Sequence, residues 1–266
     1  ALTDKKINSI MIREFYNSRK NFRAEIYEYI SILAKMKICN GNDYILFNNC
    51  FIYLKDKNFK ILSLEEGEQQ DIVTINKIPH NFNPDILNDN NVRSIVIKFF
   101  KDLACDDKDL AELLIQVIGF TMYQENKIAN TFFLTGDGSN GKSTYFKLIE
   151  YILERDMPEF KRINVSHKQL SDLSDKNELI HLRNKLLNIS DDEDNTYLKN
   201  VGTLKRIVSG ETITARALYE NAIEFIPYCK MYVSCNEIPR MSDKTDGMGR
   251  RQIIVPFNAK FKGKSK

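Results

Sequence analysis

A lysine and a serine stand side by side at the end of a glycine-rich stretch near the middle of the chain. The stretch reads Gly-Asp-Gly-Ser-Asn-Gly-Lys-Ser-Thr. Its glycines let backbone N–H groups turn inward, where they can surround phosphate oxygens. In this spacing Lys142 reaches the β- and γ-phosphates, and the Ser143 hydroxyl helps to hold Mg²⁺. The pattern predicts a nucleoside triphosphate site made by Gly136, Asp137, Gly138, Ser139, Asn140, Gly141, Lys142, Ser143 and Thr144.

The segments on either side of this loop occur in the order that a phosphate-binding site needs. Residues 131–135 are apolar, β-branched or aromatic, which predicts a strand. Residues 143–155 place Phe146, Ile149 and Leu153 on one face, which predicts an amphipathic helix whose positive end faces the phosphates. A glycine-rich turn with an exposed lysine is the alternative, and the flanking elements make it the weaker one.

An acidic pair follows residues 185–190, a second strand candidate. Hydrolysis requires a carboxylate near Mg²⁺ and a group that orients or deprotonates the attacking water. We therefore assign Asp191 to the metal and Asp192 to the water, with an exchange of the two roles as an open alternative. The acidic run 191–194 could also be a solvated loop. Its place after an apolar segment favours the catalytic interpretation.

Two further sites lie near the end of the chain. Asn236 follows a predicted strand at 230–234, where its amide can position the water; an Asx turn before Pro239 is the alternative. Arg250 and Arg251 lie on a glycine-flexed loop before a predicted strand at 252–255. They are either surface charges or an arginine finger that acts on the nucleotide of a neighbouring subunit.

Composition limits the class of protein without naming it. The chain has 266 residues, 42% hydrophobic and 28% charged, which is ordinary for a globular protein. A net charge of +3 neither proves nor opposes a nucleic-acid partner. Five cysteines without Cys-x2-Cys spacing indicate reduced thiols in a cytoplasmic protein rather than a zinc site. No stretch resembles a membrane span or a signal peptide, so no membrane partner is expected.

The predicted elements divide into two parts. Apolar stripes predict two helices in the first 38 residues, and short strands are expected at 44–47, 50–54 and 59–64. Helices are expected at 92–103 and 109–123, and we place the domain boundary near residue 105, which gives domains 1–105 and 106–266. After the phosphate loop, strands alternate with helices, which predicts an α/β fold with a mainly parallel sheet and helices on both faces.

With these pieces in order, the chain resembles the superfamily 3 AAA+ helicases, in particular the C-terminal helicase module of phage, plasmid and mobile-island primase–helicases. The loop is similar to the family's G-x-G-x-N-G-K-S/T motif. Asp191-Asp192 is similar to its acidic pair, and residues 234–239 to its N-x-x-P sensor. Residues 250–257 resemble its arginine-finger strand, with Arg251 in the place of the finger and Arg250 beside it. The resemblance implies an AAA+ P-loop NTPase fold, with residues 1–105 as a small, mainly helical domain with short strands, acting as a collar.

Residues 204–219 resemble the segment that carries a DNA-gripping β-hairpin in this family. Strand-like runs at 213–218 and 222–226 flank a turn that contains Tyr219 and Asn221, our candidates for DNA contact. An aromatic ring there can stack on a base, and Arg216 can meet a phosphate. Lys205 corresponds to a basic position that the family directs toward the adjacent subunit's nucleotide.

The resemblance implies an ATP- and Mg²⁺-dependent DNA helicase that moves 3′ to 5′ on single-stranded or forked DNA. It implies a ring, usually a hexamer, that replicates a phage, plasmid or mobile genetic element in the cytoplasm of a bacterium or a virus-infected cell. One alternative is a nucleotide-controlled DNA-binding initiator or loader without productive unwinding. A phosphotransferase that uses the same loop on a small substrate is another.

Overall fold

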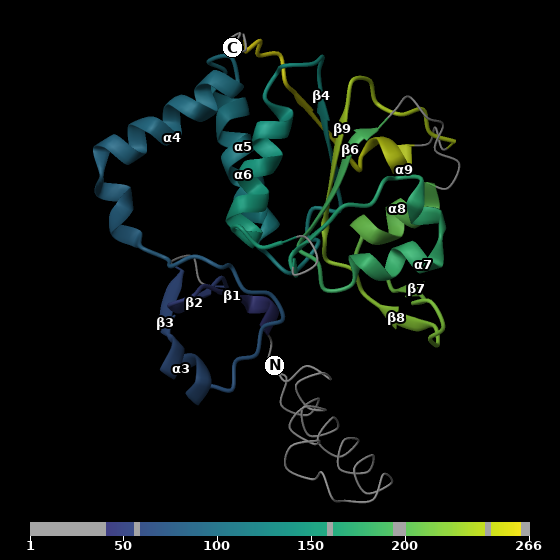
Figure 1. Ribbon diagram of the computed structural model, residues 1–266, viewed down its shortest axis with the longest axis horizontal. Helices are drawn as coiled ribbons and strands as arrows, with labels where there is room; N and C mark the ends of the chain where they lie inside the picture. The colour runs from purple at the N-terminus through teal and green to yellow at the C-terminus, as the bar shows by residue number, and fades with distance from the viewer. Residues whose placement is uncertain (1–40, 56–58, 159–161, 194–200, 243–245, 262–266) are drawn as a thin grey trace, which may run out of the picture. The chain divides into compact units, whose positions relative to one another are not determined.

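The computed structural model describes residues 41–55, 59–158, 162–193, 201–242 and 246–261 (Figure 1). The chain divides into two compact units, Ala1–Ile75 and Asn76–Lys266. The two helices predicted in the first 38 residues lie outside the described residues. The division comes before the boundary predicted near residue 105, because the helix Asn90–Leu103 packs against the helix that follows it inside the second unit.

The described part of the first unit is a small antiparallel sheet followed by a short helix. The strands β1 (Tyr44–Leu46), β2 (Cys50–Tyr53) and β3 (Lys60–Ser63) pair in chain order, and β2 lies between the other two. All three predicted strands are therefore present. Helix α3 (Leu64–Gln69) begins with a capping box, in which the Ser63 and Glu66 side chains each accept a hydrogen bond from the other residue's N–H.

A five-stranded parallel sheet forms the centre of the second unit. Its strands are β4 (Thr131–Thr135), β5 (Val165–Ser166), β6 (Leu187–Glu193), β9 (Lys230–Cys235) and β10 (Gln252–Pro256). They lie in the order β10-β4-β9-β6-β5, and every neighbouring pair is parallel. The predicted parallel sheet is confirmed, and the edge strand β5 is an addition to it. Because the strands are parallel, all five carboxyl ends meet at one edge of the sheet.

Helices cover both faces of this sheet (Figure 1). On one face, the Tyr232 hydroxyl donates to the carbonyl of Val117, 2.8 Å away. On the other, Phe133 and Val233 join a core with Leu204. The first face carries α5 (Lys108–Thr121) and α6 (Lys142–Glu154), with α4 (Asn90–Leu103) packed outside α5, and the second carries α7 (Lys176–Leu179) and α8 (Val201–Val208).

The remaining elements are short. They are the 3₁₀ helices η1 (Gly41–Asp43), η2 (Pro84–Asn88), η4 (Asp172–Ser174) and η5 (Ile180–Leu182), the helix α9 (Asp246–Gly249), and the strands β7 (Ile213–Ala215) and β8 (Ile223–Phe225). In the described part of the chain, no helix combines the length and the apolar composition that crossing a membrane requires.

Candidate nucleotide-binding and hydrolysis site

The glycine-rich loop joins β4 to α6, as predicted. Gly141 is the N-cap of α6 with φ 93°, and no side chain caps the helix. Beyond the Lys142 N–H, which donates to the Asn140 side chain, the first turn of α6 is therefore left for a ligand, and the positive end of the helix favours an anion there. Gly136 also has a positive φ, 146°, and a Cβ on it would collide with the Phe257 carbonyl and the Asn140 amide. The backbone here requires glycine at both positions.

Lys142 is the first residue of α6, and its side chain lies across the loop. The residue is only 7% exposed. Its ammonium group donates to the carbonyl of Gly136 at 2.6 Å and to that of Cys235, at the end of β9, at 3.0 Å. A phosphate oxygen can replace one of these neutral acceptors, because a hydrogen bond between two charged groups is stronger. The next residue, Ser143, is exposed, as a hydroxyl that reaches a metal ion must be.

Asn140 supplies a test of whether an anion fits this loop. It is 5% exposed, and its Oδ1 accepts from the Lys142 backbone N–H at 3.3 Å. Its Nδ2 is buried and has no hydrogen-bond partner among the described residues. Leaving a buried donor unpaired costs about 1–3 kcal/mol. A phosphate oxygen in the loop would remove this cost, so the loop fits the triphosphate that the sequence predicts.

The acidic pair lies inside β6 rather than after it, which corrects the predicted end of that strand at residue 190. Ser190 pairs with Val233 and Glu193 with Cys235, so Asp191 and Asp192 together oppose one residue of β9. This bulge interrupts the ladder and re-aims the side chains at the carboxyl edge. Asp191 is half-buried. The backbone of Asp192 is described, but its side chain lies outside the described atoms.

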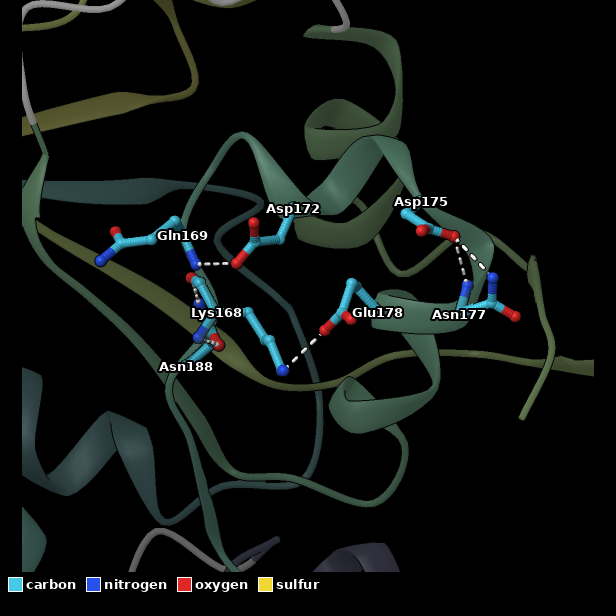
Figure 2. A network of polar contacts seen from close by, with 7 residues as sticks. All are labelled: Lys168, Gln169, Asp172, Asp175, Asn177, Glu178 and Asn188. Carbon is cyan, nitrogen blue, oxygen red and sulfur yellow. Dashed lines mark hydrogen bonds and ion pairs between the residues drawn. The ribbon is translucent and has the colours of Figure 1, made fainter. Parts of the chain in front are cut away.

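A polar network holds the residues that lead into this bulge (Figure 2). The Asn188 side chain exchanges two 3.0 Å hydrogen bonds with the backbone of Lys168, and the Ser190 hydroxyl donates to the same carbonyl at 2.7 Å. The Lys168 ammonium in turn donates to Glu178 on α7 at 2.6 Å. Our sequence reasoning did not find these supporting residues. The signal for them is that the polar residues Asn188 and Ser190 alternate with the apolar Leu187 and Ile189 at the start of the strand.

Asn236 follows β9 directly, at the same edge of the sheet. Thr135 pairs with Cys235, and the N–H of Gly136 donates to the Cys235 carbonyl at 3.3 Å. The end of β9 therefore lies beside the beginning of the phosphate loop, and Asn236 is exposed there. The sheet thus brings three predicted residues to one edge, Lys142, Asp191 and Asn236.

The two arginines lie at the amino ends of the strands, opposite to the carboxyl ends that carry the phosphate loop. The Arg251 carbonyl accepts a hydrogen bond of 2.7 Å from the N–H of Thr131, the first residue of β4. Five strand residues separate this point from the loop, about 16 Å at 3.3 Å per residue. The structure therefore does not bring Arg250 or Arg251 to the phosphate loop of its own chain.

The two arginine side chains also differ from each other. Arg251 donates to the Ser209 hydroxyl at 3.2 Å and to the carbonyl of Gly247 at 2.6 Å, within its own chain. Arg250 is exposed. The predicted finger position, Arg251, is thus the one that the fold holds, and Arg250 is the one that can extend toward another copy.

The predicted hairpin is present, with shorter strands than expected. β7 (Ile213–Ala215) and β8 (Ile223–Phe225) pair antiparallel, and Tyr219 between them is 97% exposed. Arg216 and Asn221 are also exposed, and the Arg216 Nε donates to the Glu220 carbonyl at 3.0 Å. Lys205 lies half-buried on α8, the helix that precedes the hairpin.

Comparisons with known proteins connect the chain with viral proteins that are named as putative helicases. Residues 134–251 match a family described as "Family of unknown function (DUF5906)". The chain is 32% identical over 155 residues to "Putative helicase L207/L206" of Acanthamoeba polyphaga mimivirus, which is 58% of this chain and 16% of that protein. It is 24% identical over 248 residues to "Putative helicase 121R" of Invertebrate iridescent virus 3, 87% of this chain and 26% of that protein. The chain therefore spans only a part of these viral relatives.

Solved structures show the same fold. Two apo structures of the C-terminal region of NrS-1 each match with a TM-score of 0.50 at 15% identity, over 88% of this chain and 62% of theirs. At this identity the likeness concerns the fold alone. Together with the parallel sheet and the loop between β4 and α6, it confirms the predicted fold class, an α/β P-loop NTPase.

Proposed function

We propose that this chain is the ATP-driven motor of a DNA helicase. The viral relatives that are named as helicases support a helicase-like function. The loop supports nucleotide binding, because Lys142 is held across it and Asn140 offers an unpaired buried donor. ATP is the proposed fuel. Ser143 and Asp191 would hold Mg²⁺, which neutralises charge on the phosphates when bound.

One observation carries the motor proposal: the loop and the arginines occupy opposite edges of the same sheet. An arginine that stabilises the transferred phosphoryl group must therefore come from another copy. Identical copies that join one edge to the other form a head-to-tail contact, which closes into a ring when the rotation permits. We propose such a ring, of six copies as in the family that the sequence resembles, with Arg250 as the residue that each copy contributes to its neighbour.

Hydrolysis then follows from the residues at the two edges. Lys142 binds the β- and γ-phosphates, while Asp192 and Asn236 orient the attacking water. Arg250 of the next copy stabilises the charge that develops on the γ-phosphoryl group. Once this group has left, the arginine loses its partner and the contact between the copies changes.

DNA would lie against the β7–β8 hairpin, whose exposed Tyr219 can stack on a base and whose Arg216 can contact phosphate. Asn221 is a third candidate for contact. Stacking and phosphate contacts carry little sequence information, so binding should depend on salt more than on sequence. The proposed path is single-stranded DNA, followed 3′ to 5′, during replication of a virus or mobile element.

A strand-displacement assay with oppositely tailed substrates tests this function. The chain with ATP and Mg²⁺ is expected to displace a strand from a 3′-tailed duplex but not from a 5′-tailed one, and Lys142→Ala to displace neither. ATP turnover and DNA binding without displacement would instead identify an initiator or loader. Transfer of phosphate to a small acceptor by a monomer would identify a phosphotransferase.

A further inference from the structure

A cavity of about 470 Å³ borders the phosphate loop on the side away from β9. Its floor is the loop and the first turn of α6, with Ser139, Gly141 and Thr144. Its walls are the end of α4 and the segment after β10. These walls contribute Phe99, Asp102, Leu103 and Phe261. The cavity has the size of ordinary ligand sites and is mainly apolar, as such sites are.

The walls are attached to the loop itself. The N–H of Phe261 donates to the Ser139 carbonyl at 2.9 Å, and the N–H of Phe257 to the Thr135 carbonyl at 2.7 Å. Figure 1 shows this last segment passing over the end of β4 toward the junction of α4 and α5. A Cβ on Gly141 would collide with the Leu103 side chain, so the wall and the loop are in close contact. Because Ser139, Gly141 and Thr144 also line the cavity, a ligand of the loop can extend into it.

Two aromatic rings in the cavity are suited to a flat, apolar ligand. Phe261 is 44% exposed and Phe99 is half-buried, so part of each ring remains uncovered. Base stacking on such rings is sequence-tolerant, because every base has a π-face. With the phosphates of a nucleotide at the start of α6, its base end could reach the cavity past Thr144, which lines it.

Asp102 is the one ionisable side chain among the cavity-lining residues. It is exposed, and its carboxylate has no hydrogen-bond or ion-pair partner within the part of the chain that the structure describes. A carboxylate can only accept hydrogen bonds. Adenine, guanine and cytosine each offer an exocyclic amino group. Uracil instead presents a carbonyl oxygen on each side of its single ring N–H, and a carboxylate repels these oxygens.

We propose that this cavity binds the nucleobase: Phe99 and Phe261 stack on it, and Asp102 selects bases with an exocyclic amino group, adenine among them, over uracil. The proposal rests on the proposed function, because it needs a triphosphate in the loop. It adds the residues that determine which nucleoside triphosphate is bound. It also gives the segment that ends at Phe261 a role in nucleotide binding.

Displacement of a fluorescent, ribose-labelled ATP analogue from the full chain tests this proposal. ATP, UTP and inorganic tripolyphosphate serve as competitors, and the last has no base. ATP is expected to compete about tenfold better than UTP, and Asp102→Asn to remove most of this preference. Phe261→Ala should weaken ATP about tenfold and leave tripolyphosphate unchanged. Phe261→Tyr keeps the ring, and Asp106→Asn removes a nearby exposed carboxylate that does not line the cavity; both should behave as the wild type.

The outcomes separate the two proposals. Equal competition by ATP and UTP, or an equal loss of ATP and tripolyphosphate in Phe261→Ala, would overturn the base site while the phosphate site stands. Failure of ATP and tripolyphosphate alike to bind the wild-type chain would overturn both.

Discussion

At the residue scale, the ammonium group of Lys142 is in place before any phosphate arrives, because the carbonyls of Gly136 and Cys235 hold it across the loop. Lys142→Ala removes the charge that meets the transferred phosphoryl group. We expect ATP hydrolysis to fall by about 100-fold or more. Phosphate release at saturating ATP measures this. Lys147→Ala, an exposed lysine on the same helix, is the matched control and should retain activity. Normal turnover by Lys142→Ala would refute the site.

Substitutions of the two arginines should have different effects, because the side chain of Arg251 is hydrogen-bonded within its own chain and that of Arg250 is exposed. Arg250 is exposed, so Arg250→Ala should leave thermal stability and ATP binding unchanged and lower turnover by about 10³-fold. Arg251→Ala deletes two hydrogen bonds, to Ser209 and Gly247, and should lower the free energy of unfolding by roughly 1–2 kcal/mol. Urea denaturation measures the stability of the two variants, and phosphate release measures their ATP turnover. A stable but inactive Arg251→Ala beside an active Arg250→Ala would make Arg251 the finger.

This pair shows where sequence reasoning ends at the residue scale. The loop could be predicted because its chemistry is local: nine consecutive residues carry the glycines, the lysine and the serine. The pair Arg250-Arg251 is equally visible in the sequence, but the difference between its members is not. That difference comes from Ser209, 42 residues earlier, which accepts a hydrogen bond from one guanidinium group only through the tertiary fold.

At the scale of elements, the β7–β8 hairpin places Tyr219 where DNA can reach it. Tyr219→Ala should weaken binding to single-stranded DNA by about tenfold, whatever the sequence, because stacking is lost. ATP hydrolysis without DNA should not change, since the Tyr219 side chain is 97% exposed and its loss leaves no gap in the fold. Anisotropy titrations with several labelled oligonucleotides measure the effect. Tyr219→Phe keeps the ring and should bind normally; equal losses in both variants would argue against stacking.

The start of β9 carries a buried lysine that makes stability depend on pH. Burial lowers the pKa of Lys230 from 10.5 to about 7. Its ammonium group donates to the carbonyls of Tyr123 and Tyr228 and lies 4.8 Å from the centre of the Phe120 ring. Between pH 7 and 9 the folded chain releases this proton while the unfolded chain keeps it. The unfolded state then binds more protons, so the free energy of unfolding rises with pH.

Urea denaturation at pH 7, 8 and 9 measures this rise, and Lys230→Met should remove it. Burial also raises the pKa of Cys229 from 9.0 to about 12, which lowers stability as the pH rises through about 9 and so opposes the effect of the lysine there. Burial also lowers the pKa of Lys185, so the comparison with Lys230→Met, and not the pH window alone, identifies the contribution of Lys230. An unchanged slope in Lys230→Met would mean that another group is responsible.

Element types were predictable here and element ends were not. The strands and helices around the loop follow from local hydrophobic patterns. The bulge in β6 does not, because it depends on pairing with β9, whose Val233 and Cys235 lie some 40 residues later in the sequence. Strand β5 has only two residues, too few for a pattern, and it exists because Val165 and Ser166 pair with β6. The candidate metal ligand Asp191 was thus found by its type and order, while its geometry required the fold.

At the scale of the whole second unit, the parts proposed to act on ATP and on DNA are joined by named contacts. Arg251 links the arginine segment to Ser209, which lies just before the hairpin. The N–H of Arg216 donates to the Lys176 carbonyl on α7 at 3.0 Å. Helix α7 is tied through Glu178 to Lys168, and Lys168 to the strand that carries Asp191 (Figure 2). Covalent or hydrogen-bonded contacts therefore connect both ends of the strands to the hairpin, and a movement at either end can be transmitted to it.

The separation of the two edges makes a final prediction about mixtures of inactive copies. Lys142→Ala destroys the loop site of its own copy but retains Arg250, while Arg250→Ala does the reverse. If each site is shared, some contacts in a mixed ring pair an intact loop with an intact arginine. For random mixing in equal amounts these are about a quarter of the contacts, so turnover should recover to about that fraction of the wild type.

Light scattering on the same samples confirms that rings have formed. Mixing Lys142→Ala with the double variant should restore nothing, because no copy then carries an intact loop. Rings that form from the two single variants without any recovered turnover would show that each copy hydrolyses ATP alone.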